Sequence, residues 1–326
     1  MEFRTKVEIL NSYIRISHRS RLLMLGSCFI ENIGKQLIDN KFDVDLNPFG
    51  ILYNPASIAR SLQILLDNYQ FTEKDVFQYK GLYNSFLHHG LFSHADKEEA
   101  LSHINKRIDK ASEYLENADF LIITFGTSYI FRHKKSNTVV SNCHKLPAAS
   151  FERYMLSVTE IADEWISLIG KMQGLNPALK IIFTVSPIRH MKDGAHDNQL
   201  SKSTLLLAVD KICKSAENCY YFPSYEIVMD ELRDYRFYNE DMVHPSPIAV
   251  KYIWERFCEA YTDESTQEIM REWRKIQQSL DHRPLNTQSD DYKHFLRQTL
   301  LKLKAFADKY PYICCNEEIS VLESKL

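Results

Sequence analysis

The chain has 326 residues, 44% of them hydrophobic and 25% charged, enough for one large core or a core with a smaller appendage. A formal net charge of −3 argues against a dedicated nucleic-acid binder, because such proteins present a basic surface. No apolar run reaches the ~20 residues of a membrane-spanning helix, and the first residues lack the apolar stretch of a signal peptide. Seven cysteines without a repeated spacing fit reduced thiols better than a disulfide framework. We therefore expect a cytoplasmic protein that binds neither nucleic acid nor membrane.

Five short apolar segments, each bounded by turn or cap residues, have the pattern of buried parallel strands. In chain order they are Leu22–Gly26, Phe42–Phe49, Phe120–Phe125, Lys180–Ser186 and Tyr220–Tyr225. Helical patterns lie between and after them, at residues 30–39, 56–69, 97–116, 150–172, 201–216 and 245–263. This alternation predicts an α/β fold with three layers, α/β/α, around a doubly wound parallel sheet of five strands.

Two interruptions and the last part of the chain depart from this alternation. Residues 76–92 and 129–145 each look like two extended segments around a turn, so we expect two hairpins inserted on the same edge. From residue 264 the pattern is purely helical. We therefore predict a main domain at 1–263 and a helical extension at 264–326, whose helices either cap the site or join two copies into a homodimer.

Polar residues gather where the strands are predicted to end, and ligands of an open parallel sheet bind beyond the carboxyl ends of its strands. These residues are Ser27 after the first strand; Asn47, Gly50 and Asn54 after the second; Gly126, Thr127 and Ser128 after the third; Ser186, Arg189 and His190 after the fourth; and Asp241 and His244 beyond the fifth.

Ser27, Asp241 and His244 together are what acyl transfer requires. A serine hydroxyl is a weak nucleophile until a base takes its proton, and imidazole is the usual base. A carboxylate on the other ring nitrogen fixes the tautomer and stabilises the imidazolium. Because Asp241 and His244 are three residues apart, one loop can deliver both groups to Ser27. Backbone amides at the start of the following helix could face the developing oxyanion.

Each of these residues also has a simpler interpretation. Ser27 stands at a helix start and could be its N-cap, and Asp241 and His244 could cap the helix near Pro245. Cys28 is a second candidate nucleophile, although a residue beside the nucleophile in such a turn is expected to point into the packing. The histidines and cysteines show no zinc-site spacing, so we expect no metal and no cofactor.

Several motifs resemble those of the GSCFA-domain family, a branch of the SGNH (GDSL-like) hydrolase superfamily. They are GSCF, NPFGILYNP, GTSYIF, NCHK, VSPIRH and YFPSYEIVMDELRDYRFYNEDMVHPSP, and the resemblance extends over residues 3–263. It implies a flavodoxin-like SGNH fold and an esterase-type site. By position, Ser27 matches the nucleophile of the first block, and Asp241 and His244 match the Asp-x-x-His of the last. Gly50 is similar to the second-block glycine whose amide binds the oxyanion, together with the amide of Ser27.

The third block departs from the superfamily pattern. SGNH enzymes usually have Gly-x-Asn there, with the asparagine side chain as an oxyanion donor, whereas this chain has Gly126-Thr127-Ser128. The missing amide could be replaced by the hydroxyl of Ser128 or by the side chain of an asparagine. Three asparagines are candidates: Asn47, Asn54 and Asn142.

The sequence thus predicts a serine esterase or acyltransferase that acts on a small O-acyl group, by superfamily analogy one carried by a carbohydrate or related polar metabolite. The predicted contacts to substrate are Asn54, Asn142, His144, Lys145, Arg189 and His190. The alternative is a catalytically silent binding or scaffold protein that keeps the fold, which the missing third-block asparagine favours and the Ser, Asp and His residues oppose.

Overall fold

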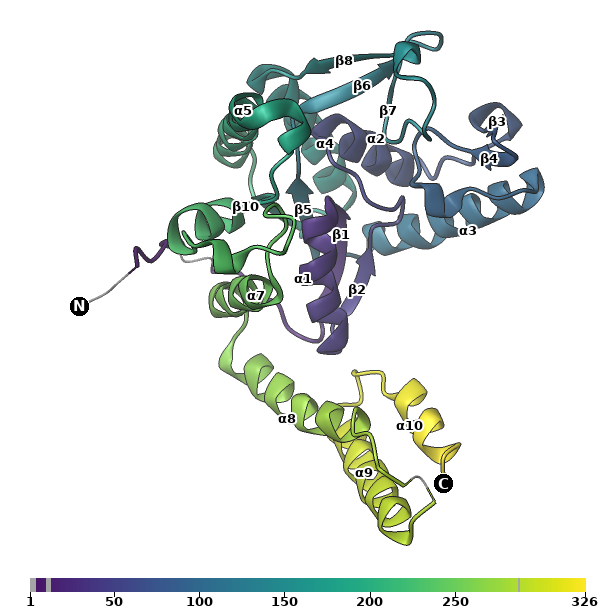
Figure 1. The fold of residues 1–326 in the computed structure, drawn as a ribbon, viewed down its shortest axis with the longest axis vertical. Coiled ribbons are helices and arrows are strands. Elements are labelled where there is room, and N and C mark those ends of the chain that lie inside the picture. Colours follow the sequence, from purple (N-terminus) through teal and green to yellow (C-terminus); the bar gives the residue numbers. More distant parts are fainter. Residues whose placement is uncertain (1–3, 10–12, 287) are drawn as a thin grey trace.

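A five-stranded parallel sheet forms the centre of the computed structural model, which describes residues 4–9, 13–286 and 288–326 (Figure 1). Its strands lie in the order β10-β9-β5-β1-β2. Their bounds are β1 (Arg21–Gly26), β2 (Asp43–Leu46), β5 (Phe120–Phe125), β9 (Lys180–Val185) and β10 (Cys219–Tyr221). All four pairings are parallel, which confirms the predicted doubly wound α/β fold with its flavodoxin-like strand order.

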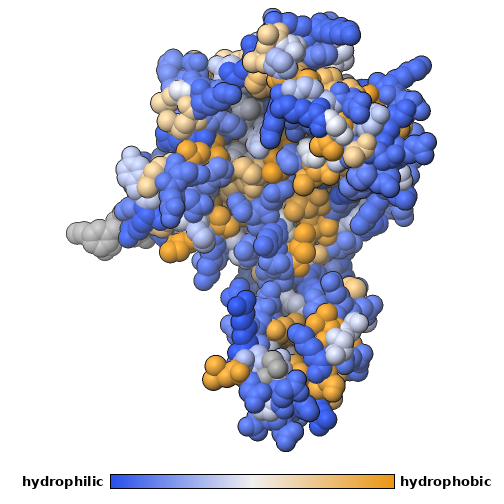
Figure 2. Space-filling model, turned by 45° about the vertical axis from the view of Figure 1, so that its right-hand side comes forward, coloured by the Kyte–Doolittle hydropathy of each residue, from blue (hydrophilic) through white to orange (hydrophobic). Residues whose placement is uncertain are grey.

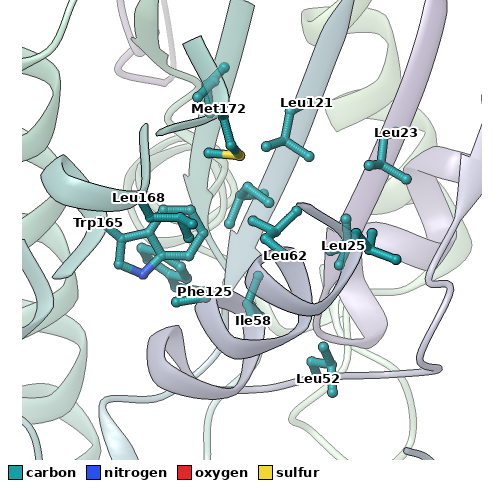
Figure 3. Close-up of a cluster of buried hydrophobic side chains, with 14 of the residues drawn as sticks. Leu23, Leu25, Leu52, Ile58, Leu62, Leu121, Phe125, Trp165, Leu168 and Met172 are labelled. Atoms are coloured by element: carbon teal, nitrogen blue, oxygen red, sulfur yellow. The ribbon is translucent and has the colours of Figure 1, made fainter. Parts of the chain in front are cut away.

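Helices cover both faces of the sheet, because successive side chains of a strand point to opposite faces. Along β1, Leu23 and Leu25 belong to one core cluster, and Leu22 and Met24 to the other. The first cluster is shown in Figure 3, where α2 and α4 pack on the sheet through residues such as Leu62 and Trp165. The helices on that face are α2 (Pro55–Leu66), α3 (Lys97–Glu116), α4 (Val158–Leu175) and α5 (Gly194–Ser215). The opposite face carries α1 (Cys28–Asp39) and α7 (Pro247–Tyr261).

Two strands are shorter than the sequence suggested. Strand β2 ends at Leu46 because Asn47 takes a left-handed backbone conformation with φ of 45°. Strand β10 ends at Tyr221, and a short helix, α6 (Ser224–Glu226), begins directly after Pro223 and runs into a π-helical turn, Ile227–Glu231.

The segment at the start of the predicted helix 150–172 is a strand, and that part of the prediction was wrong. Strand β8 (Phe151–Met155) pairs antiparallel with β6 (Tyr129–His133), which also pairs with β7 (Thr138–Val140). The helix starts only after Ser157, whose side chain forms a reciprocal capping box with Glu160. The first predicted hairpin is β3 (Phe77–Tyr79) with β4 (Leu82–Asn84). The second is β6 with β7, and β8 extends it to a three-stranded sheet.

The C-terminal helices form a small lobe with a core of their own. They are α8 (Glu264–Leu280), α9 (Asp290–Lys309) and α10 (Asn316–Glu323), and α8 follows directly after its cap, Asp263. Their apolar faces pack on one another around Trp273 and Leu303. Figure 2 shows this lobe with a mainly hydrophilic surface and scattered hydrophobic residues. The division after residue 263 and the homodimer both stay predictions.

The lobe contacts the main body at the edge of the sheet opposite to the carboxyl ends of the strands (Figure 1). Trp273 Nε1 donates a hydrogen bond to the carbonyl oxygen of Asp39, the last residue of α1, at 2.7 Å. Lys41, just before β2, lies over the Trp273 ring and pairs with Glu318 of α10. The C-terminal helices therefore do not cap the predicted site of their own chain.

In the described part of the chain, no helix is long and apolar enough to cross a membrane.

Gly26 allows the end of β1 to lie tightly against β5. Its φ is +151°, and a Cβ at this position would lie 2.4 Å from the backbone oxygen of Thr124.

Gly26→Ala should therefore lower the free energy of unfolding by about 2–4 kcal/mol, because the backbone of β1 or β5 must shift to make room for the methyl group. Chemical denaturation checks this. Gly170→Ala is the matched control, because nothing lies within 4 Å of the added methyl group inside α4. It should leave stability unchanged or raise it by up to ~1 kcal/mol. Equal effects of the two changes would contradict the account.

Candidate active site

The predicted site lies where the strand order reverses. The helix after β1 packs on one face of the sheet and the helix after β5 on the other, which makes the carboxyl ends of these neighbouring strands the switch point. Open α/β sheets bind their ligands at this point. Ser27 follows β1 there, and Gly126 follows β5. A Cβ on Gly126 would lie 3.2 Å from the Ser27 Cβ, so the glycine lets the two strand ends meet.

The Ser27 side chain does not cap the helix that it precedes. The residue has the extended backbone of an N-cap, with φ of −71° and ψ of 172°, but its hydroxyl makes no capping hydrogen bond. The side chain is 1% exposed, and its Oγ has no hydrogen-bond partner among the described residues. An unpaired buried polar group costs about 1–3 kcal/mol. The simpler interpretation of Ser27 as an N-cap therefore does not explain why a hydroxyl is buried here.

Asp241 and His244 form a hydrogen-bonded pair in the loop before α7. The Oδ2 of Asp241 lies 2.6 Å from the Nδ1 of His244. Its Oδ1 accepts hydrogen bonds from the backbone amides of Val243 and His244, both at 2.9 Å. These amide bonds, that of His244 first, lower the pKa of Asp241 to about 2, so the carboxylate stays ionised at neutral pH. Both side chains are about half exposed.

The pair does not cap α7, which was its alternative interpretation. Ser246 is the N-cap of that helix, and its Oγ accepts a hydrogen bond from the backbone amide of Ala249. The loop is closed further back, where the amide of Asn239 donates to the carbonyl oxygen of His244 at 2.8 Å. Asp241 therefore serves to orient the imidazole, and the Nε2 atom of His244 faces the turn between β1 and α1.

The Nε2 atom of His244 contacts the sulfur of Cys28, at 3.9 Å. Cys28 packs against the core cluster on the α1 side of the sheet, as the sequence indicated, but its sulfur also faces the imidazole, which the sequence did not indicate. No hydrogen bond joins Ser27 Oγ to His244. Burial raises the pKa of the Cys28 thiol, and the nearby Glu31 raises it further, so the group is a neutral thiol at pH 7.

The predicted oxyanion donors have other partners in this structure. The amide of Gly50 donates to the carbonyl oxygen of Asn47 at 2.8 Å. Ser128 is wholly buried, and both its amide and its hydroxyl donate to Ser201 Oγ, at 2.9 and 3.0 Å. The amide of Ser27 has the longest contact, 3.3 Å to the carbonyl oxygen of Thr124. Of the three predicted donors, Ser27 is therefore the most easily released.

The three candidate asparagines differ in whether their side-chain NH₂ groups already donate a hydrogen bond. Asn47 uses both ends of its side chain, accepting from the Gly26 amide at 3.0 Å and donating to Glu31 at 3.4 Å. Asn54 accepts the Ser57 amide as the N-cap of α2, and Asn142 accepts the amide of His144. Neither the Asn54 nor the Asn142 NH₂ group donates to any described residue.

Asn54 directly follows a residue that is hydrogen-bonded to the turn after β5. The carbonyl oxygen of its neighbour Tyr53 accepts hydrogen bonds from the amides of Gly126 and Thr127, at 2.8 and 3.0 Å. The Asn54 side chain is 6% exposed and precedes the buried Pro55. The free NH₂ group of Asn54 thus belongs to a segment that is hydrogen-bonded, through Tyr53, to the turn after β5.

The NCHK segment joins the two inserted sheets. His144 Nε2 lies 2.7 Å from the carbonyl oxygen of Ser85, and the carbonyl oxygen of Lys145 accepts the Tyr79 hydroxyl at 3.4 Å. Burial lowers the pKa of His144, so its imidazole is neutral at pH 7. His144 thus has a structural partner, and the substrate contacts expected of Asn142 and Lys145 stay predictions.

Arg189 and His190, in the loop after β9, have different surroundings. Arg189 lines a surface pocket of about 500 Å³ together with Tyr235, Tyr238 and Asp241. The only hydrogen bond of its guanidinium within the described residues goes to Met229 Sδ at 3.2 Å, and it forms no ion pair there. His190 lies at the turn after β5, where burial and then a nearby cation lower its pKa to about 4.

That cation is Lys202, which the sequence interpretation missed. Its side chain is wholly buried, and its Nζ donates to the carbonyl oxygens of Gly126 and Ser186 at 2.6 and 2.7 Å. Helix α5 starts at Gly194, seven residues before its predicted start at 201. With the full helix in view, Asn198, Ser201 and Lys202 share the spacing of the buried apolar residues that follow. Polar residues at the buried positions of this helix were the feature of the sequence that could have identified Lys202.

Within the described residues, no group of three or more histidine, cysteine or acidic side chains is placed to hold a metal ion. His88 is wholly buried and stacked on Phe49, and burial lowers its pKa to about 3. It is therefore a neutral core residue.

Solved structures with carbohydrate-esterase titles are similar to this chain at low identity. The family 3 carbohydrate esterase of Clostridium thermocellum has 10% identity and a TM-score of 0.34, with 77% of this chain and 97% of that chain covered. The acetyl xylan esterase of the rumen bacterium Butyrivibrio proteoclasticus has 13% identity and a TM-score of 0.33, with 76% and 64% covered. No curated protein sequence matches the chain.

The family comparison covers most of the chain. The GSCFA family matches residues 21–257, a range that includes Ser27, Asp241 and His244. A second match, to the C-terminal domain of GSCFA domain proteins, covers residues 273–326, which lie in the helical lobe. The chain therefore belongs to the GSCFA family.

Proposed function

We propose that the protein is a serine hydrolase of SGNH type that removes, or transfers, a small O-acyl group. Ser27 is the nucleophile, His244 the general base and then acid, and Asp241 the group that orients the imidazole. The observation that carries the proposal is the 2.6 Å pair of Asp241 and His244, whose second ring nitrogen faces the turn at the switch point. The buried, unpartnered hydroxyl of Ser27 in the same turn supports it.

The reaction proceeds in two halves. Ser27 Oγ attacks the acyl carbon while its proton passes to His244 Nε2, and the C–O bond to the leaving alcohol breaks as the same proton is returned to that alcohol. Water or an acceptor hydroxyl then attacks the acyl-serine by the reverse sequence. In this structure His244 contacts Cys28 instead of Ser27, so its half-exposed ring must move to the neighbouring oxygen. Such catalytic hydrogen bonds often form only when substrate is bound.

The oxyanion is held by the amide of Ser27 and the side-chain NH₂ of Asn54. The hydrogen bond of the Ser27 amide is longer than those of the other predicted donors. The Asn54 NH₂ group has no partner among the described residues. Asn54 thereby takes the part of the missing third-block asparagine, and Ser128 does not, because its hydroxyl is held by Ser201.

The pocket beside Asp241 holds the substrate. Tyr235 and Tyr238 give it an aromatic wall, which suits a sugar ring or another flat apolar face. Arg189 brings an unpaired guanidinium to the same pocket. This combination fits a polar ester that carries an anionic group, and the carbohydrate assignment rests on analogy with the SGNH superfamily.

Cys28 is the second candidate nucleophile, because its sulfur lies 3.9 Å from His244 Nε2. The raised pKa of the thiol opposes this assignment, since cysteine attacks as the thiolate. A catalytically silent scaffold is the remaining alternative.

Ser27→Ala should lower kcat for an aryl acetate by at least ~10³-fold, because no nucleophile remains. The matched variant Cys28→Ala should keep kcat within about threefold and lower the melting temperature, because a half-buried side chain is lost. Steady-state turnover and thermal melts of both variants check this. Full activity of Ser27→Ala with loss in Cys28→Ala would make the thiol the nucleophile, and no turnover by the wild type would favour the scaffold.

Asp241→Asn should lower kcat by ~10³–10⁴-fold with little change in KM, because the amide no longer holds the imidazole in the reactive tautomer. The wild-type carboxylate, with its pKa lowered to about 2, stays ionised as pH falls to about 4, so protonation of Asp241 does not limit activity there. The control is Glu240→Gln, an exposed neighbour, which should be neutral. Equal activity of Asp241→Asn and Glu240→Gln at pH 7 would remove Asp241 from the mechanism.

Arg189→Gln should raise KM for an aryl ester with a carboxylate on its acyl chain by ~10-fold or more, and leave KM for the acetate ester unchanged. Arg233→Gln is the matched control, because Arg233 lines the same pocket but is paired with Asp230 at 3.1 Å. Parallel KM measurements with the two esters check this. The same KM change for both esters would show that Arg189 does not recognise a charge.

A further inference from the structure

Lys202 is a buried cation without a carboxylate partner. Its side chain is wholly enclosed, and its two hydrogen bonds go to the carbonyl oxygens of Gly126 and Ser186. No acidic side chain of the described residues forms an ion pair with it. Lysine is almost never fully buried unless it is paired, because the desolvation of an ammonium is costly.

The hydrogen bonds alone do not require a charge at this position. The neighbouring amides already donate elsewhere, those of Gly126 and Thr127 to Tyr53 and that of Ser186 to Phe125. The buried carbonyl oxygens of Gly126 and Ser186 therefore need other donors. A neutral amide side chain could supply two, so a lysine brings a positive charge that the backbone does not need.

The charge of Lys202 is coupled to negative charge at the nucleophile turn. The pKa of Lys202 is lowered to about 7, mainly by burial, while an anion at Cys28 acts to raise it and the nearby Arg189 acts to lower it. In return, Lys202 lowers the pKa of the Cys28 thiol. An oxyanion formed on the acyl group of Ser27 lies at the same turn and has the same sign, so it and the ammonium stabilise each other.

We propose that Lys202 is a positioning residue for the acyl transfer described above. Its hydrogen bond to Gly126 fixes that turn against Ser27, and its buried ammonium supplies positive charge that stabilises the oxyanion. It acts in this way together with the two proposed oxyanion donors, the amide of Ser27 and the NH₂ group of Asn54. The inference rests on the proposed function, and its tests separate the two.

Lys202→Met keeps the apolar stem and removes the charge and both hydrogen bonds. We expect kcat for an aryl acetate to fall ~10- to 100-fold with KM within about twofold, because the charge acts on the transition state. Lys202→Gln can donate to the carbonyl groups without a charge and should show most of the same loss. Lys211→Met is the control on the same helix, where Lys211 forms an exposed pair with Asp163, and it should be neutral. Full activity of Lys202→Gln would overturn the proposal.

The pH profile distinguishes a charge from a packing role. In the wild type, kcat/KM should fall as pH rises above about 7, because the free enzyme loses the Lys202 proton there. Lys202→Met should lose this alkaline decline. The charged or titratable groups facing Lys202 are Cys28, Arg189 and His190, and His190, with its pKa at about 4, does not titrate in this range. Cys28→Ala excludes the thiol as the source. A decline that persists unchanged in Lys202→Met would overturn the proposal.

A measurement that needs no turnover tests the role of Lys202 even if the proposed function fails. Alkylation of Cys28 by iodoacetamide, followed across pH by peptide mass spectrometry, reports the ionisation of the thiol. If wild type hydrolyses no ester, the proposed function fails, but the charge of Lys202 should still raise the alkylation rate of Cys28 at pH 6–7, where the lysine carries its proton. Lys202→Met should lower the rate in this range, and Lys211→Met should not. If Lys202→Met does not fold, Lys202→Gln replaces it in each comparison, and an unchanged rate at pH 6–7 in the folded variant would overturn the inference.

Discussion

The candidate site depends on the close approach of two strand ends at the switch point of the sheet. Gly26 and Gly126 lack the side chains that would separate β1 from β5, and a Cβ at either position would meet backbone at 3.0 Å or less. Because the strands meet there, Ser27 is enclosed and its hydroxyl has no described partner. The proposed roles of the residues at the carboxyl ends of these strands, the nucleophile and its oxyanion donors, depend on that enclosure.

The charges around Ser27 are arranged on two sides. On the open side, Asp241 is ionised and exposed, and it orients His244 toward the turn. On the buried side, Lys202 joins the ends of β5 and β9 and carries a charge whose presence depends on nearby anions. The imidazole contacts the Cys28 thiol in this structure, and it forms no hydrogen bond with its proposed proton donor, Ser27. A serine hydrolase built in this way would assemble its proton relay only when a substrate displaces that contact.

The sequence predicts the frame of the molecule better than its details. Apolar runs bounded by turn residues identified all five strands of the central sheet. Asp241 and His244 are three positions apart, a spacing that one loop can close. Strand β8 was missed because Ser157 starts the helix only after a segment that pairs with β6. Lys202 was missed because burial of a charge depends on three segments distant in sequence. The orientation of Cys28 depends on the loop that brings His244, which no local pattern encodes.

The most direct measurement of the central claim is the site of covalent modification by a fluorophosphonate probe, located by peptide mass spectrometry. The account predicts an adduct on Ser27 that forms in the wild type and is lost when His244 is changed to alanine, because the hydroxyl requires that base. An adduct on Cys28, or labelling of Ser27 that persists without His244, would contradict the account.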